Sequence, residues 1–219
     1  MPDPRLKKPS RKVTHVDEDM RKLVEDMTET MVKYDGVGLA AVQVGVPKRL
    51  ILVRVPESIE QKLDKEEAEA ILAGDDELAK KGILKITVEK ADQPDSKPTV
   101  TYLRRTVYWP PPTVCINPRI VEKEGLIIDD EGCLSDMRYQ AKVERARRVV
   151  VAAQDMDMQP IKIEAWGFEA RCIQHEIDHL EGILYLDRMI VDTRKCMDGR
   201  EIDEELEEGE CEVEEVTSG

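Results

Sequence analysis

The chain has 219 residues, long enough for one well-buried core, and its formal charge is −14 at pH 7. Apolar residues make up 41% of it and charged residues 37%, and the negative balance argues against a general nucleic-acid binder, because a phosphate backbone requires a basic surface. Ten acidic residues and no basic one lie between Glu201 and Glu215, so most of the imbalance belongs to an acidic tail, residues 201–219, that we expect to be disordered.

The cysteines are odd in number and widely spaced: Cys115, Cys133, Cys172, Cys196 and Cys211. In a chain of this length, that pattern favours a reducing compartment over a disulfide framework. No apolar run approaches the roughly 18 residues of a membrane span, and no signal peptide is recognisable. We therefore expect a cytoplasmic protein with no membrane partner. An organelle stays open as an alternative, since a removed leader would leave the same start.

The first expected helix covers Asp17–Tyr34, with Asp17 as its N-cap and Gly36 as its stop signal. Its apolar residues follow helical spacing and are expected to face the core: Met20, Leu23, Val24, Met27 and Met31. Arg49–Val55 then predicts a buried strand that ends before Pro56.

The composition changes over residues 57–112, which we interpret as an insertion rather than a second core-forming domain. Helix formers and charges dominate Glu60–Ala73 and Asp75–Lys81, which predicts helix. Ile83–Val88 and Thr99–Val107 favour strands. The expected insertion is therefore a helical and hairpin excursion within a main domain of residues 1–200.

Further strands are predicted at Val114–Ile128, Arg147–Ala153 and Pro160–Ala165, followed by a helix at Phe168–Leu180. Strands outnumber helices, and neither a βαβ alternation nor an internal repeat is present. The pattern favours an α+β fold in which antiparallel sheet encloses one long helix.

The strongest chemical signal is the motif His175-Glu176-Ile177-Asp178-His179 within that helix. Histidines at i and i+4 lie on one helix face and can bind one metal ion, and the glutamate beside the first can act on a water molecule. The alternative is a helix with two surface histidines beside a salt-bridged glutamate.

A catalytic metal needs a third protein ligand, for which Cys133 in Glu131-Gly132-Cys133-Leu134-Ser135 is the candidate. One thiolate and two imidazoles suit Fe(II), Zn, Co or Ni rather than Mg or Ca. Taken alone, this pentapeptide equally fits a buried structural cysteine.

The third motif is Gly36-Val37-Gly38-Leu39-Ala40-Ala41-Val42-Gln43. It lacks the third glycine of a nucleotide-binding loop and follows a helix rather than a strand, so we reject that interpretation. Its small residues permit close backbone packing, and the Gln43 amide can donate a hydrogen bond to a developing oxyanion. A simple packing turn is the alternative.

In this order, GxGxAAxQ, EGCLS and QHExDHLxG resemble the pattern of the peptide deformylase family. The resemblance extends over Pro2–Val55 and Val114–Ile190. It implies a peptide deformylase-like fold with antiparallel sheets around a central HExxH helix. It also implies hydrolysis of the N-formyl group of N-formylmethionyl nascent peptides, with release of formate.

The resemblance also implies roles for individual residues. The metal ligands would be Cys133, His175 and His179, with Fe(II) as the usual metal and Zn, Ni or Co as possible occupants. Glu176 would be the general acid and base, and Glu131 would orient the site through hydrogen bonds. The tetrahedral intermediate would be stabilised by Gln43 and the backbone N–H of Leu134.

Substrate selection would come from an apolar pocket for the methionine side chain. Its expected members are Val37, Phe168, Arg171 and Cys172, of which Arg171 is unusual in such a pocket. Phe168 and Cys172 equally fit an ordinary core. Gly38 and the backbone around Gly132 would pair with the peptide as strands do.

Two features depart from the family pattern. Family members usually reach the segment Ile116-Asn117-Pro118 through a short hairpin, where this chain has the insertion over residues 57–112. Some bacterial members carry a basic C-terminal helix that docks on the ribosome, whereas this tail is acidic. Any ribosome association is therefore expected to use another route, and no specific nucleic-acid partner is expected.

Two other functions compete with this interpretation. Other HExxH proteases add a downstream Glu or His ligand, but Glu181 follows His179 by only two residues. A binding module with a relict metal site would tolerate the loss of Glu176 or Gln43, and both are present.

Overall fold

The computed structural model describes residues 3–63, 83–89, 99–191 and 193–196. The chain divides into two compact units, Met1–Arg54 with Pro112–Gly219, and Val55–Pro111. The acidic tail, residues 201–219, lies outside the described residues, as does most of the helix predicted at Glu60–Ala73 and the one at Asp75–Lys81.

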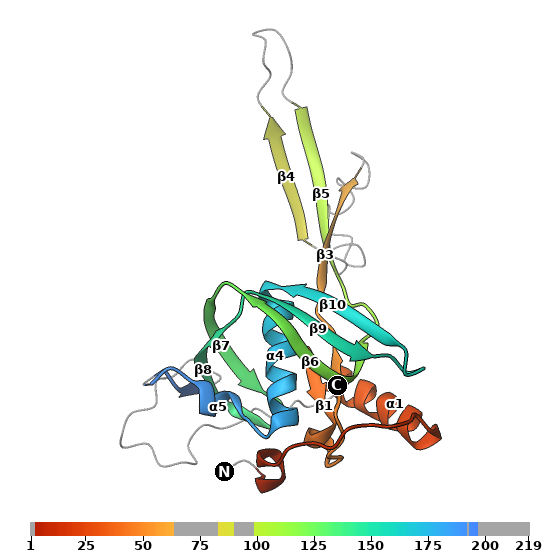
Figure 1. Cartoon of the computed structure of the whole chain (residues 1–219). Coiled ribbons are helices and arrows are strands. Elements are labelled where there is room, and N and C mark those ends of the chain that lie inside the picture. Colours follow the sequence, from red (N-terminus) through yellow and green to blue (C-terminus); the bar gives the residue numbers. More distant parts are fainter. Residues whose placement is uncertain (1–2, 64–82, 90–98, 192, 197–219) are drawn as a thin grey trace. The chain divides into compact units, whose positions relative to one another are not determined.

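The first unit contains a five-stranded antiparallel sheet in the order β1-β2-β6-β9-β10 (Figure 1). Its strands are β1 Gly38–Ala40, β2 Leu50–Val53, β6 Thr113–Glu124, β9 Arg148–Gln154 and β10 Pro160–Trp166. All four residues of β2 are buried, as expected for a strand covered on both faces. Along β10, Lys162 and Glu164 are exposed while Ile161 and Ile163 are partly covered, which confirms the predicted half-exposed strand.

A second antiparallel sheet has the order β11-β8-β7, with β7 Ile127–Cys133, β8 Asp136–Arg145 and β11 Lys195–Cys196. The single strand expected over Val114–Ile128 was therefore wrong in extent. The chain turns at Gly125, which has a φ of 64°, and leaves β6 in one sheet and β7 in the other. Glycine adopts this left-handed conformation without the strain that a Cβ would add.

Helix α4, Gly167–Glu181, lies between the two sheets (Figure 1), which confirms the predicted α+β class and the central HExxH helix. Ten of its residues are buried, including the charged Arg171, Glu176 and Asp178. It ends at Gly182, whose φ is 75°. The short helix α5, Tyr185–Arg188, follows. None of the described helices is long and apolar enough to cross a membrane.

Helix α1, Glu18–Lys33, confirms the first expected helix. The Asp17 side chain accepts a hydrogen bond from the Met20 N–H at 2.9 Å, as an N-cap should. Met20, Met27 and Met31 are buried in a cluster with residues of β1, β2 and β6, so the methionine stripe belongs to the core. Two 3₁₀ helices, η1 Pro4–Lys7 and η2 Ala41–Val44, complete the described helices.

The second unit contains an antiparallel sheet in the order β3-β5-β4. Its strands are β3 Glu57–Leu63, β4 Ile83–Glu89 and β5 Thr99–Tyr108. Strands β4 and β5 confirm the predicted hairpin strands. The helix predicted at Glu60–Ala73 is wrong over Glu60–Leu63, which belongs to β3. Glu60–Leu63 pairs residue by residue with β5, and this ladder outweighs the local helix propensity of the segment.

Candidate active site

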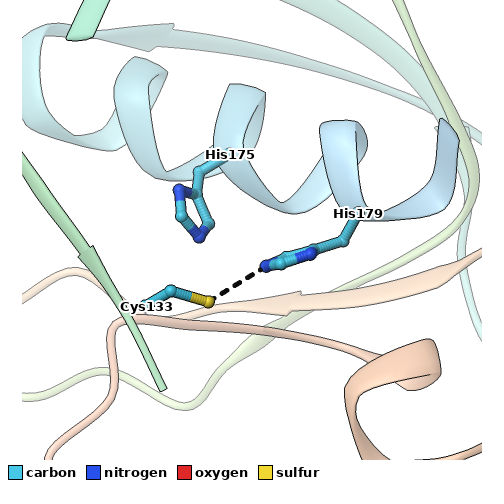
Figure 2. Close-up of side chains that lie close together, drawn as sticks. All are labelled: Cys133, His175 and His179. Atoms are coloured by element: carbon cyan, nitrogen blue, oxygen red, sulfur yellow. Dashed lines mark hydrogen bonds between the residues drawn. The ribbon is translucent and has the colours of Figure 1, made fainter. Parts of the chain in front are cut away.

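Strand β7 and helix α4 bring the three predicted metal ligands together. Cys133 is the last residue of β7, while His175 and His179 are one turn apart on α4. One possible ligand atom from each lies within 4.8 Å of the others, and both rings face the sulfur (Figure 2). The Cys133 Sγ lies 3.3 Å from His179 Nε2. Three convergent donors leave space for further ligands, as a catalytic metal requires.

The charges around these donors favour a cation. Burial acts to lower the pKa of His175, but hydrogen bonds to Cys133 and Glu131 outweigh it and raise the pKa to about 10. Surroundings that stabilise positive charge on His175 also favour a metal ion among the three donors. Burial lowers the pKa of His179 to about 3, so this ring stays neutral, as a metal ligand must. The donor set therefore fits a divalent transition metal.

Glu131 of β7 orients His175. Its Oε2 lies 3.1 Å from His175 Nδ1, which turns the opposite nitrogen, Nε2, toward the other two donors. Burial acts to raise the pKa of Glu131, but hydrogen bonds from His175 and Arg145 lower it to about 2. The carboxylate is therefore charged, and it favours the tautomer that carries a proton on Nδ1.

Glu176 is a buried carboxyl beside the donors. The residue is 4% exposed, and its Oε2 has no hydrogen-bond partner among the described residues. Burial raises the pKa of Glu176 to about 7, which suits a group that both accepts and donates protons near neutral pH. Gly38 of β1 makes room for it, because a Cβ on Gly38 would lie 2.4 Å from Glu176 Oε1.

Gln43 in η2 has a fixed amide orientation. Its Oε1 accepts from the Ala40 N–H at 2.7 Å, so Nε2 must point the other way. There, Nε2 donates to Ser135 Oγ at 3.1 Å and lies 3.5 Å from Cys133 Sγ. The amide donor is therefore directed at the space beside the three predicted metal ligands.

A cavity of about 380 Å³ opens beside these groups, and twelve of the thirteen predicted site residues line it. They are Val37, Gly38, Gln43, Glu131, Gly132, Cys133, Leu134, Phe168, Arg171, Cys172, His175 and Glu176. The exception is His179, which is fully buried. The cavity lining is mainly apolar, in keeping with a pocket for an uncharged side chain.

Phe168, Cys172 and Arg171 differ in their exposure and in their contacts within the pocket. Phe168 is half exposed, so it is not an ordinary core residue. Burial raises the pKa of Cys172 to about 12, and its neutral thiol behaves as a small apolar group. The Arg171 guanidinium turns toward β7, where it donates to Asp129 Oδ2 at 2.5 Å and to the Asp130 carbonyl at 2.6 Å.

Our sequence reasoning missed several members of the site. The additional residues that line the cavity are Tyr34, Asp35, Gly36, Asp130 and Met137. It also missed Arg145, which donates to both carboxylate oxygens of Glu131 at 2.9 Å. A signal was present, since Arg145 continues the buried alternation of Tyr139, Ala141 and Val143 along β8. A charged residue at such an inward position requires a buried partner.

Comparisons with known proteins agree on one family. The family model described as polypeptide deformylase matches residues 1–195. The peptide deformylase of Alkalilimnicola ehrlichii is 34% identical over 194 residues, which cover 89% of this chain and 82% of the relative. The crystal structure of peptide deformylase from Ehrlichia chaffeensis is similar with a TM-score of 0.61 and 33% identity, over 87% of this chain and 86% of that one. A Met-Ala-Ser-bound class I type b peptide deformylase from Acinetobacter baumannii has a TM-score of 0.58 and 26% identity, over 85% and 93% of the two chains.

Proposed function

Because the chain belongs to the peptide deformylase family of metal-dependent hydrolases, which remove the N-formyl group from nascent peptides, we propose a role in that reaction for each residue of its cavity. The observation that carries the proposal is the convergence of Cys133, His175 and His179 beside the buried Glu176.

Cys133, His175 and His179 hold one divalent ion, and Fe(II) is the proposed occupant, with Zn, Ni or Co as alternatives. A thiolate and two imidazoles bind all four of these metals, so the donor set alone does not select among them. When bound, such an ion supplies Lewis acidity that polarises the formyl carbonyl and makes a water molecule more acidic.

The protein residues divide the remaining chemistry. Glu176 accepts a proton from the attacking water as its oxygen bonds to the formyl carbon. Gln43 Nε2 and the Leu134 N–H donate to the oxygen that becomes negative, where oriented donors are most effective. Glu176 then returns the proton to the departing amine, which leaves formate and a free amino terminus.

The peptide lies between two sheet edges. Strand β1 ends the five-stranded sheet, and β7 ends the three-stranded one, so each has one edge without a neighbouring strand among the described elements. An extended peptide can pair with Gly38 on one side and with Gly132 on the other. The first side chain then enters the pocket of Val37, Phe168 and Cys172, in keeping with the Met-Ala-Ser bound to the Acinetobacter baumannii relative.

We place the protein in a bacterial-type cytoplasm, because its substrates arise where translation starts with formylmethionine. An organelle that translates in the same way is the alternative. Residues 201–219 contain no basic residue, so contact with the ribosome through a basic C-terminal helix is not part of this proposal.

Formate release from formyl-Met-Ala-Ser tests the proposed function. Protein loaded anaerobically with Fe(II) is expected to hydrolyse this peptide and to leave acetyl-Met-Ala-Ser intact, since the added methyl group obstructs a site built for formyl. Equal turnover of both peptides, or cleavage of internal peptide bonds, would contradict the assignment and favour a general protease.

Replacing residues 55–111 by a short turn should preserve activity. Val53 of β2 and Thr113 of β6 are paired neighbours, so the insertion leaves and re-enters the first unit at adjacent points. All residues that line the cavity belong to the first unit. We expect metal content to be unchanged and kcat/KM to stay within about threefold, since surface loops tolerate length changes. A soluble, folded deletion variant with neither metal nor activity would show that the insertion supports the site.

A further inference from the structure

Glu131, which contacts His175, belongs to a longer series of charged side chains that are linked by hydrogen bonds. Arg145 at the end of β8 holds both oxygens of Glu131 at 2.9 Å, and its third nitrogen donates to Asp178 Oδ2. Arg188 of α5 then holds Asp178 from the other side through Nε and Nη2, the latter at 2.7 Å from Oδ1. We name Glu131, Arg145, Asp178 and Arg188 the ionic chain.

The ionic chain joins four elements behind the metal ligands. Glu131 comes from β7, Arg145 from β8, Asp178 from α4 and Arg188 from α5. The side chains of Arg145 and Asp178 are 3% and 9% exposed, whereas that of Arg188 is 40% exposed. Arg145, Asp178 and Arg188 line a second cavity of about 270 Å³, separate from the one beside the metal ligands. The ionic chain therefore extends from Glu131, which contacts the proposed ligand His175, to the solvent-accessible Arg188.

The backbone that carries Arg145 is also anchored to α4. Gln174 accepts from the Ala146 N–H at 3.1 Å and donates to the Ala146 carbonyl at 2.9 Å. The end of β8 is therefore fixed to the helix that carries both histidines. A planar guanidinium fixed in this way can hold the Glu131 carboxylate in one plane, which a single ammonium group cannot do.

We propose that Arg145 and Asp178 are positioning residues for the metal centre, acting on His175 through Glu131. Arg145 contacts both oxygens of Glu131, and Glu131 Oε2 also lies 3.1 Å from His175 Nδ1. Asp178 holds Arg145 in place, and Arg188 holds Asp178. The inference rests on the metal site proposed above, because its effect is the presentation of His175 to a metal ion.

The affinity of the 219-residue chain for Co²⁺ tests the proposal. Metal-free wild type and Arg145→Lys are titrated with Co²⁺ against a competing chelator, and the thiolate and ligand-field absorption bands are followed. Arg145→Lys should bind Co²⁺ roughly 10- to 100-fold more weakly, as expected when the support of a metal-ligating histidine is lost. At saturating metal, kcat for formyl-Met-Ala-Ser should fall while KM stays within about twofold.

Arg148→Lys is the matched control. Arg148 also contacts three carboxylates, with Glu164 at 2.7 Å, Glu122 at 3.3 Å and Glu124 at 3.5 Å, but it lies outside the ionic chain. This variant should keep wild-type Co²⁺ affinity. Thermal unfolding of the metal-free proteins separates the two effects, because a purely structural role for Arg145 would lower its unfolding temperature without weakening Co²⁺ binding to the folded form.

A double variant tests the route. If Arg145 acts through Glu131, then Glu131→Gln with Arg145→Lys should bind Co²⁺ within about twofold of Glu131→Gln alone. If the two substitutions weaken Co²⁺ binding multiplicatively, the proposal is wrong. It is also wrong if Arg145→Lys binds Co²⁺ with wild-type affinity.

If Arg145→Lys does not fold, Arg188→Gln at the exposed end of the ionic chain replaces it. This variant should bind Co²⁺ at least about threefold more weakly, and an unchanged affinity would count against the proposal. A wild type without thiolate–cobalt absorption would instead refute the metal site itself.

Discussion

Replacing Glu176 by glutamine will lower kcat for formyl-Met-Ala-Ser by roughly 10²- to 10⁴-fold and leave metal content unchanged. Glutamine preserves the size and most of the polarity of the side chain but cannot take a proton from water. Glu176 fits the role because it is buried, lies next to the proposed metal ligands, and has an oxygen without a partner among the described residues. Formate release and metal analysis of the same preparation provide the two measurements.

The role of Glu176 also predicts how kcat/KM changes with pH. Burial raises the pKa of Glu176 to about 7, and a divalent cation nearby acts to lower it by favouring the carboxylate. A general base must be ionised, so kcat/KM for the wild type should fall as the pH drops through a value at or below about 7. This acidic limb should be missing from the residual activity of Glu176→Gln.

Glu181→Gln is the control on the same helix. Glu181 is half exposed and accepts a hydrogen bond from Arg49 at 2.7 Å, so it takes part in a surface ion pair. Its replacement should change kcat by less than about twofold, because such pairs contribute little. Loss of metal in this variant would revive the protease alternative with a glutamate ligand. Substantial activity in Glu176→Gln would assign the acid and base role to another group.

Regular local patterns made parts of the fold predictable. The helical spacing of Met20, Met27 and Met31 and the Asp17 cap located α1 to within one residue at each end. The alternation around Ile161 and Ile163 did the same for β10. In each case, one face of the element is covered and the other is exposed, so the residue pattern carries the structural information.

Elements decided by distant partners were harder to predict. Glu60–Leu63 has the composition of a helix, but it forms part of β3 because β5 supplies hydrogen bonds to its backbone. The segment Val114–Ile128, predicted as a strand, is divided between β6 and β7, because the left-handed turn at Gly125 leads the backbone from one sheet to the other. In both cases, the structure depends on which distant strand supplies the hydrogen bonds, and local composition does not show this.

The same distinction applies to the site. His175 and His179 could be predicted from their spacing on one helix, and Cys133 from the EGCLS motif in which it lies. Arg145 and Asp178 are 33 positions apart, and their contact depends on how the end of β8 meets α4. Support residues of this kind are ordinary charged residues in the sequence, and only the tertiary packing reveals their partners.

Removing the metal will abolish formate release and lower the stability of the first unit. The three proposed ligands come from two separate elements, β7 and α4, so a bound ion would link these elements in the folded state only. At a free metal concentration about 1,000-fold above Kd, metal binding raises the free energy of unfolding by roughly 4 kcal/mol, which corresponds to a rise of roughly 10 °C in Tm. Differential scanning calorimetry of metal-free and reloaded protein measures this rise independently of activity.

Reloading with different metals identifies the proposed occupant. Fe(II), Co, Ni and Zn should each raise Tm, because a thiolate and two imidazoles bind all of them. The Fe(II) form should lose activity in air or peroxide as the metal and the Cys133 thiolate are oxidised, whereas the Zn form should resist. Protein that is purified aerobically with full activity and no sensitivity to peroxide would argue for a redox-inert metal. Activity that survives complete removal of the metal would contradict the role of Cys133, His175 and His179, since Glu176 alone lacks the Lewis acid that its water requires.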